Sequence, residues 1–116
     1  GQRVERVQPQ VHLYSIAIPP VDAPMRLAEE IRTEYIRGTP FEELVKRDDL
    51  AQTSEAVRKG GEIGWVPRRI LPDIDALIFD DLEKGKLSDP IPAFNAEEGS
   101  TTYTIYLIKE KAGAAG

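Results

Sequence analysis

Cysteine is absent from this chain of 116 residues, and histidine occurs once, as His12. The sequence therefore excludes a disulfide framework, a thiolate metal site and a cysteine nucleophile, and we expect no metal ion and no cofactor. No apolar run approaches the ~20 residues that a membrane-spanning helix needs. Basic residues are also few, 15 against 20 acidic ones, for a net charge of −5. This balance argues against a nucleic-acid partner, because phosphates require a basic face.

What remains is typical of a globular domain, with 41% hydrophobic and 30% charged residues. The length suits a single modest core. Residues 1–10 are polar and aperiodic, so we interpret them as a linker or N-terminal arm, residues 11–111 as the domain and residues 112–116 as a flexible tail. Polar stretches of this kind are typical of domain boundaries, and we therefore expect flanking domains of a longer protein.

The hydrophobic pattern predicts an α+β domain. Residues 11–18 are rich in β-branched and aromatic side chains and apolar on both faces, which favours a central strand. Further strands are expected at 62–66, at 87–94 on a sheet edge and at 101–111; helices are expected at 24–37, 40–49 and 71–82, and either a short helix or an ordered loop at 50–61. The last two strands are joined by a short turn and should pair antiparallel.

Helix starts are marked by two local signals. Asp22 is a candidate N-cap with Pro24 in the first turn, and the stretch from Thr39 to Glu42 has the spacing of a capping box. Within the first helix we expect Leu27, Ala28, Ile31, Tyr35 and Ile36 to share the buried face.

Several glycines surround the only tryptophan, in the segment GGEIGW. Gly60 and Gly61 predict a sharp turn into a short strand, and Gly64 predicts close packing of that strand. We interpret Trp65 as a scaffold residue that anchors this strand against the domain.

Three segments in this order, GGEIGWVPR, LPDI and GKLSDP, resemble the parvulin-type (rotamase, PpiC-like) peptidyl-prolyl cis-trans isomerases. The resemblance extends over roughly residues 11 to 110. It implies a four-stranded antiparallel sheet surrounded by about four helices, an order that the predicted elements match.

The resemblance also implies a substrate site. Its apolar pocket for the proline ring would be formed by Ile63, Ile70 and Ile74, with Leu71 and Phe79 beside them. For Ile74 a place in the core is the alternative, since such side chains are commonly buried.

Three polar positions of the family's site are occupied by hydroxyls: Ser15 and Thr104 stand where the family has histidines, and Thr53 where it has aspartate or cysteine. Serine and threonine are also ordinary residues of strand faces. His12 lies three residues before Ser15, so it should point to the other face of the sheet unless a β-bulge intervenes.

Two functions follow from the resemblance. The first is a peptidyl-prolyl isomerase domain of a bacterial protein-folding factor, weak or degenerate in catalysis because of Ser15, Thr53 and Thr104. The second is a non-catalytic chaperone module that binds unfolded or proline-containing polypeptide; a dimerisation domain is a third alternative without a marked interface. By resemblance alone, we expect an extracytoplasmic location, in the periplasm or at the cell surface, with a membrane anchor as one option.

Overall fold

A computed structural model describes residues 8–113 of the chain. The elements are, in chain order, β1 (Gln10–Ile18), α1 (Pro24–Ile36), α2 (Phe41–Val45), the 3₁₀-helix η1 (Asp48–Leu50), α3 (Ser54–Arg58), β2 (Glu62–Pro67), the π-helical turn η2 (Leu77–Asp81), β3 (Ile91–Asn95) and β4 (Ser100–Ala112). The expected arm and tail lie largely outside these residues, and the domain boundaries remain a prediction.

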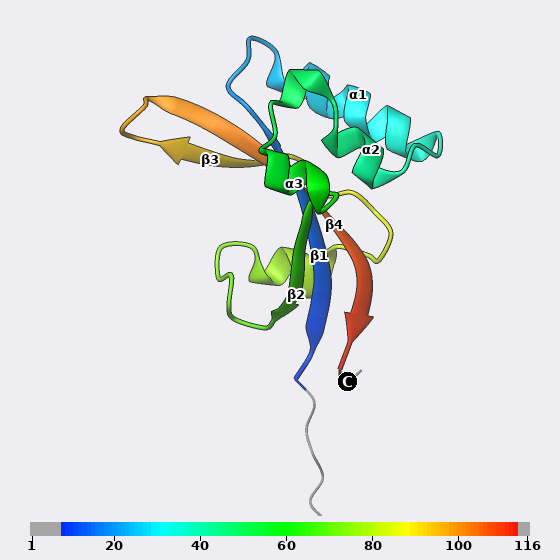
Figure 1. Cartoon of the computed structure of the whole chain (residues 1–116). Helices are drawn as coiled ribbons and strands as arrows, with labels where there is room; N and C mark the ends of the chain where they lie inside the picture. The colour runs from blue at the N-terminus through cyan, green and yellow to red at the C-terminus, as the bar shows by residue number, and fades with distance from the viewer. Residues whose placement is uncertain (1–7, 114–116) are drawn as a thin grey trace, which may run out of the picture.

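The strands form one antiparallel sheet in the order β2-β1-β4-β3 (Figure 1). The central place of β1 and the edge place of β3 are as the sequence predicts, and Pro92 is tolerated in β3 because an edge strand needs fewer ladder hydrogen bonds. With its helices, this sheet confirms the α+β class. None of the helices in residues 8–113 is long and apolar enough to cross a membrane.

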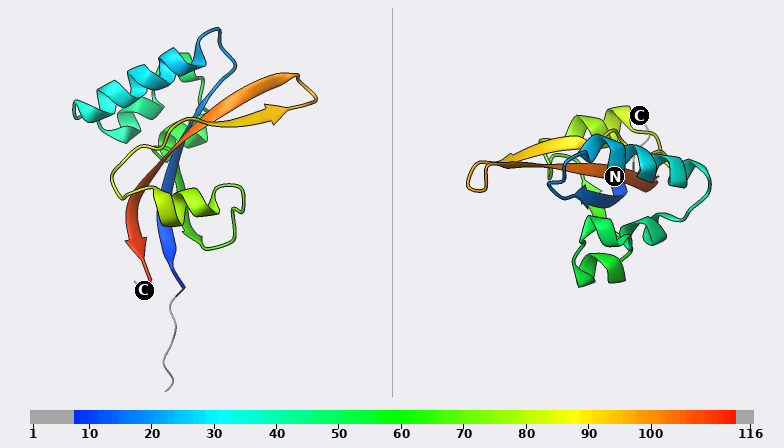
Figure 2. Two further views of the ribbon diagram at one scale, coloured as in Figure 1. Left: turned by 180° about the vertical axis from the view of Figure 1, so that it is seen from behind. Right: turned by 90° about the horizontal axis from the view of Figure 1, so that it is seen from above.

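Two cores form on opposite faces of the sheet, because side chains alternate along β1. Ile16 and Ile18 pack with α1 and α2 in the first core, whereas Val11 and Leu13 pack with the segment around η2 in the second. Viewed from above, the strands lie between η2 and the α2–α3 region (Figure 2, right).

The register of β1 is interrupted only by bulges in its partners. Pairing steps from Leu13–Gly64 to Tyr14–Glu62, which leaves Ile63 of β2 unpaired, and from His12–Glu110 to Leu13–Ile108, which leaves Lys109 of β4 unpaired. Because β1 itself carries no extra residue, His12 and Ser15 lie on opposite faces, as expected.

The turn from α3 into β2 depends on glycine. Gly60 and Gly61 have φ of 64° and 83°, and a Cβ at Gly61 would lie 2.8 Å from the carbonyl oxygen of Ser15. The predicted sharp turn is confirmed. Gly64 was expected to allow close packing, but a Cβ there would have no atom within 4 Å; its φ of 118° is the reason for glycine.

Trp65 contacts β1 at the surface and not within a core. Its side chain is 46% exposed and stacks on His12 with 5.0 Å between ring centroids. His12 in turn pairs with Glu62. This surface stack lies on the face opposite Ser15, since Trp65 is the cross-strand partner of His12.

The helix starts differ from the predicted ones. The N-caps of α1 and α2 are Ala23 and Pro40, and neither Asp22 nor Thr39 forms a capping hydrogen bond. Ile36 is 74% exposed, because five residues after Ile31 is about 140° around a helix of 3.6 residues per turn.

The segment 50–61, for which the pattern allows a short helix or an ordered loop, contains α3. The helix expected at 71–82 is shorter than predicted, because much of it is turns followed by η2. The amide of Leu82 donates to the carbonyl of Leu77 at 2.7 Å, a π-type bond that widens the helix. Ile74, Ile78 and Leu82 thereby all reach the second core.

Candidate functional site

The face of the sheet that carries Ser15 is open between η2 and the β3–β4 hairpin, where no helix lies over it (Figure 2, left). Ser15 of β1 pairs with Tyr106 of β4, and Ala17 pairs with Thr104. All four residues point to this face, since paired residues share a face and β1 alternates. Ala17 is exposed and the others are half-buried. Ser15 and Thr104 are therefore diagonal neighbours, a relationship that corresponds to about 7–8 Å.

Thr53, the third predicted hydroxyl, has a structural role. It is the N-cap of α3, and its Oγ1 accepts a hydrogen bond from the amide of Ala56 at 3.1 Å. Such a bond satisfies one of the unpaired amides at a helix start. The Thr53 side chain is thus committed to α3, whereas Ser15 and Thr104 lie together on the sheet.

Gln52 joins the segment before α3 to β1. Its Nε2 donates to the carbonyl oxygens of Ala17 at 2.7 Å and Leu50 at 3.0 Å, and the amide of Ala17 donates to Oε1 of Gln52 at 3.3 Å. Pairing with β2 ends earlier, where the amide of Ser15 donates to Gly61 at 2.9 Å. The side-chain amide of Gln52 therefore bonds to the edge of β1 at a position where β2 no longer pairs with it. This contact brings the neighbouring Thr53 toward Ala17. Nothing in the sequence pattern assigned Gln52 this function.

Tyr106 is the second residue of this region that the sequence analysis missed. It packs against the second core beside Ser15. Burial raises the pKa of its phenol above the ordinary value, and hydrogen bonding by the Thr104 side chain acts in the opposite direction. The phenol therefore remains a neutral hydrogen-bond donor at physiological pH. The available signal was the two-residue spacing from Thr104, which places both side chains on one strand face.

The five predicted pocket residues divide into two groups. Leu71, Ile74 and Phe79 pack on the second core, and Ile74 is a core residue, only 7% exposed. Ile63 and Ile70 belong to neither core and are 49% and 62% exposed. In this conformation Leu71 and Phe79 offer a partly exposed apolar surface, whereas Ile74 supports it from below. Contact of any of the five with a substrate remains a prediction.

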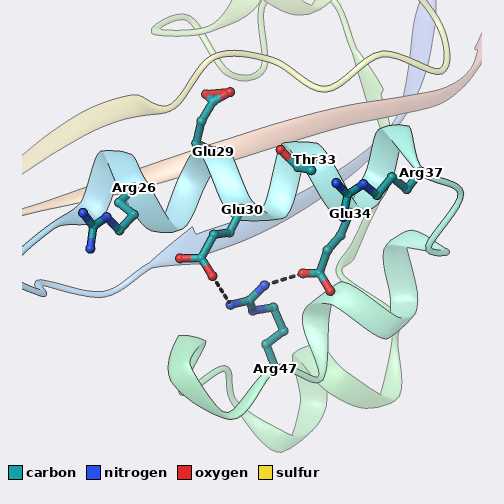
Figure 3. Close-up of a pocket in the computed structure, with 7 residues that line it drawn as sticks. All are labelled: Arg26, Glu29, Glu30, Thr33, Glu34, Arg37 and Arg47. Carbon is teal, nitrogen blue, oxygen red and sulfur yellow. Dashed lines mark hydrogen bonds and ion pairs between the residues drawn. The ribbon is translucent and has the colours of Figure 1, made fainter.

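A large surface cavity, of about 670 Å³, lies elsewhere, between α1 and Arg47 (Figure 3). Arg47 pairs with Glu34, with Glu30 at 3.5 Å and with Asp49 at 2.7 Å. The hydrogen bonds from Arg47 lower the pKa of Asp49. This charged cluster holds α1 against the α2–η1 segment and includes none of the predicted site residues.

The chemistry of the open face is that of hydrogen-bond donors beside an apolar surface. Residues 8–113 contain no group of three side chains that would hold a metal ion. The hydroxyls of Ser15, Thr104 and Tyr106 can donate to a carbonyl oxygen. None of them is a base near neutral pH, so the arrangement suits hydrogen bonding rather than proton transfer.

No family model matches the chain, and no curated protein matches it in sequence. Several solved structures match the chain in fold. A PpiC-type peptidyl-prolyl cis-trans isomerase domain superposes with a TM-score of 0.67 at 18% identity, over 93% of this chain and 95% of that one. NmPin, the parvulin of Nitrosopumilus maritimus, superposes with a TM-score of 0.62 at 20% identity, over 87% of this chain and 96% of that one. The peptidylprolyl isomerase PrsA from Bacillus cereus gives 0.66 at 20% identity, over 96% of this chain but 38% of that longer one.

At these identities the comparisons establish the fold: the chain is a parvulin-like domain in architecture. The fold implied by GGEIGW and GKLSDP is therefore confirmed, and the two segments lie where β2 and the approach to β3 form.

Proposed function

We propose that this parvulin-like domain is a weakly active peptidyl-prolyl cis-trans isomerase domain of a bacterial protein-folding factor. Its substrate would be unfolded or proline-containing polypeptide. The observation that carries the proposal is the juxtaposition of Ser15, Thr104 and Tyr106 on one open sheet face. The apolar surface of Leu71 and Phe79 belongs to the core on that same face.

The reaction requires rotation about an amide bond against a barrier of ~18–20 kcal/mol. No covalent bond breaks. A proline ring held beside Leu71 would leave its amide over the strands, and a hydroxyl donating to the carbonyl oxygen or the prolyl nitrogen would favour the twisted state, in which amide resonance is lost. Interactions stronger in the twisted state than in the planar one lower the barrier.

Catalysis is expected to be slow, because the three polar positions carry no ionisable group and Thr53 is committed to α3. Removing one preorganised donor from an electrostatic site costs about 10²–10³-fold in rate. The same observation favours the second candidate, a non-catalytic module that binds proline-containing polypeptide on this face.

The proposal of a foldase draws on names among the matched structures, which include a foldase protein PrsA from Streptococcus pneumoniae. An extracytoplasmic location, with flanking domains in a longer protein, is part of the same proposal. It is supported only by resemblance.

The experiment is a protease-coupled isomerisation assay with several residues placed before proline, together with peptide binding measured by NMR shifts of the backbone amides. We expect a rate above background and at least about a hundredfold below that of an ordinary parvulin. Tyr106→Phe and Thr104→Val should each weaken it further. Thr101→Val is the matched control, the same residue type on β4 but on the opposite face.

The outcomes separate the two candidates. A rate at background with shifts retained at Ser15 and Thr104 would replace the isomerase by the binding module. Shifts confined to other parts of the domain would refute both, because each places the peptide on this face.

A further inference from the structure

Two adjoining cavities lie at the end of the sheet where β1 begins and β4 ends. Figure 1 shows this end of the sheet. The first, of about 340 Å³, includes Val11, Arg68, Phe79 and Lys111 in its wall. The second, of about 260 Å³, includes Arg68 and Arg69. Arg68 is common to both, and we refer to the pair as the basic end cavity.

Among residues 8–113, the wall of the basic end cavity contains three cationic side chains and no carboxylate, in a chain whose net charge is −5. Arg69 and Lys111 are exposed, and neither side chain has an ion-pair partner within residues 8–113. This end of the domain therefore combines positive charge with open space, which suits a carboxylate.

Arg68 has a different role from the other two cations. Its guanidinium pairs with Asp80 at 3.0 Å and Asp75 at 3.3 Å and lies 5.2 Å from the ring centroid of Phe79. Oδ1 of Asp75 also accepts a hydrogen bond from the backbone amide of Arg69 at 2.6 Å. The charge of Arg68 is thus largely neutralised, and these contacts hold the loop that presents Arg69. Arg69 and Lys111 supply the available positive charge.

The basic end cavity adjoins the apolar surface of the candidate site at Phe79. The second core covers β1 between them, since Val11 and Leu13 are 1% and 0% exposed. Val11 lines the cavity and Ser15 lies four residues further on the same face, a separation of about 13 Å at 3.3 Å per residue. Phe79, one of the predicted substrate contacts, lines the cavity as well. An extended polypeptide that passes over Phe79 covers that distance with at least four residues.

We propose that the basic end cavity binds an acidic side chain of the same polypeptide whose proline lies over Ser15 and Thr104. This inference rests on the proposed function and defines its substrate class: proline-containing segments with Asp or Glu about four residues from the proline. Arg69 and Lys111 are the selecting residues. The pairing is solvent-exposed, so it adds modest affinity and is screened by salt.

The test uses three labelled peptides and measures affinity by fluorescence anisotropy with the whole chain. One peptide has a central proline with Glu four residues before and four after it, the second has Gln at both places, and the third has the two Glu but alanine for proline. At low salt we expect the Glu–Pro peptide to bind about three- to tenfold more tightly than the Gln–Pro peptide, the effect of one or two exposed ion pairs. The difference should shrink as salt rises.

The double variant Arg69→Gln/Lys111→Gln should abolish the preference and leave the affinity for the Gln–Pro peptide unchanged. Arg26→Gln/Arg37→Gln is the matched control, because it removes two exposed arginines, one in α1 and one at its C-cap, from the remote cavity shown in Figure 3. It should leave the preference intact.

Three results would overturn the inference: equal affinity for the Glu–Pro and Gln–Pro peptides, a preference that survives in Arg69→Gln/Lys111→Gln, or full affinity for the Glu peptide without proline. Failure of the proposed function gives a different result. In that case the Gln–Pro peptide would leave the NMR signals of Ser15 and Thr104 unshifted, whatever the effect of charge.

Discussion

The side-chain amide of Gln52 and the backbone of Ala17 are joined by two hydrogen bonds, of 2.7 and 3.3 Å. Gln52 thus continues the hydrogen bonding of β1 beyond the point where β2 stops pairing. Ala17 is the cross-strand partner of Thr104. Through this relationship the loop before α3 is held beside the open face on which we place the peptide.

Substitution Gln52→Ala should therefore loosen the loop and lower the free energy of unfolding. With three partly exposed hydrogen bonds lost, we expect a decrease of about 1–2 kcal/mol and faster hydrogen exchange at Ala17, measured by urea denaturation and NMR. Gln8→Ala, at an exposed position, should change stability by less than about 0.5 kcal/mol. Unchanged exchange at Ala17 would show that Gln52 does not hold the strand.

Thr53 offers a test of structural against catalytic use of a hydroxyl. Thr53→Ala should cost about 1 kcal/mol of stability through loss of the N-cap, while Thr53→Ser and Thr53→Asp should retain it, because both side chains cap well. Isomerisation rates of the folded Ala and Ser variants should match the wild type. A slower rate in Thr53→Ala at full stability would instead assign the hydroxyl to the substrate.

The isoleucines Ile70 and Ile74 form a matched pair, since the resemblance assigns both to the proline pocket. Ile74 is 7% and Ile70 62% exposed. Ile74→Ala should lower the free energy of unfolding by about 2–4 kcal/mol, the cost of a cavity in a core, and Ile70→Ala by less than about 0.5 kcal/mol.

Thermal or urea denaturation measures the free energy of unfolding of both isoleucine variants. Similar losses would contradict the division between core and surface. If Ile70 contacts substrate, its variant should lose peptide affinity without losing stability.

Stability should fall at alkaline pH in part through Tyr106. Its pKa is raised above 10.0 in the folded state, chiefly by burial, so folding favours the protonated phenol. This contribution is fully present below about pH 10, the unfolded value, and is lost as pH rises through the folded pKa.

Tyr106→Phe should make the alkaline loss of stability smaller, as measured by urea denaturation at pH 8 and pH values above about 10. The pKa values of Tyr14 and Tyr35 are raised as well, so part of the loss should persist in the variant. An identical alkaline loss in Tyr106→Phe and wild type would show that the phenol titrates alike in both states.

How far the site was predictable differs from residue to residue. Ser15 and Thr104 were found through resemblance, and strand alternation correctly separated Ser15 from His12. Gln52 and Tyr106 were missed. Gln52 bonds to β1 only because the loop before α3 packs beside that strand, and Tyr106 lies beside Ser15 only because β4 pairs with β1. For Trp65 the sequence indicated an anchor of its strand, but not that the contact would be an exposed stack on His12 of β1.

The sequence by itself determined the element order, the central and edge strands and the glycine turn, because these depend on alternation, β-branching and backbone conformation within short segments. Its motifs also indicated the fold. Only the tertiary structure decided that Thr53 caps a helix, that Ile74 is core and that Arg69 and Lys111 border an open cavity. Each of those properties depends on which distant segments pack nearby, and burial and charge environment are set by that packing rather than by local sequence.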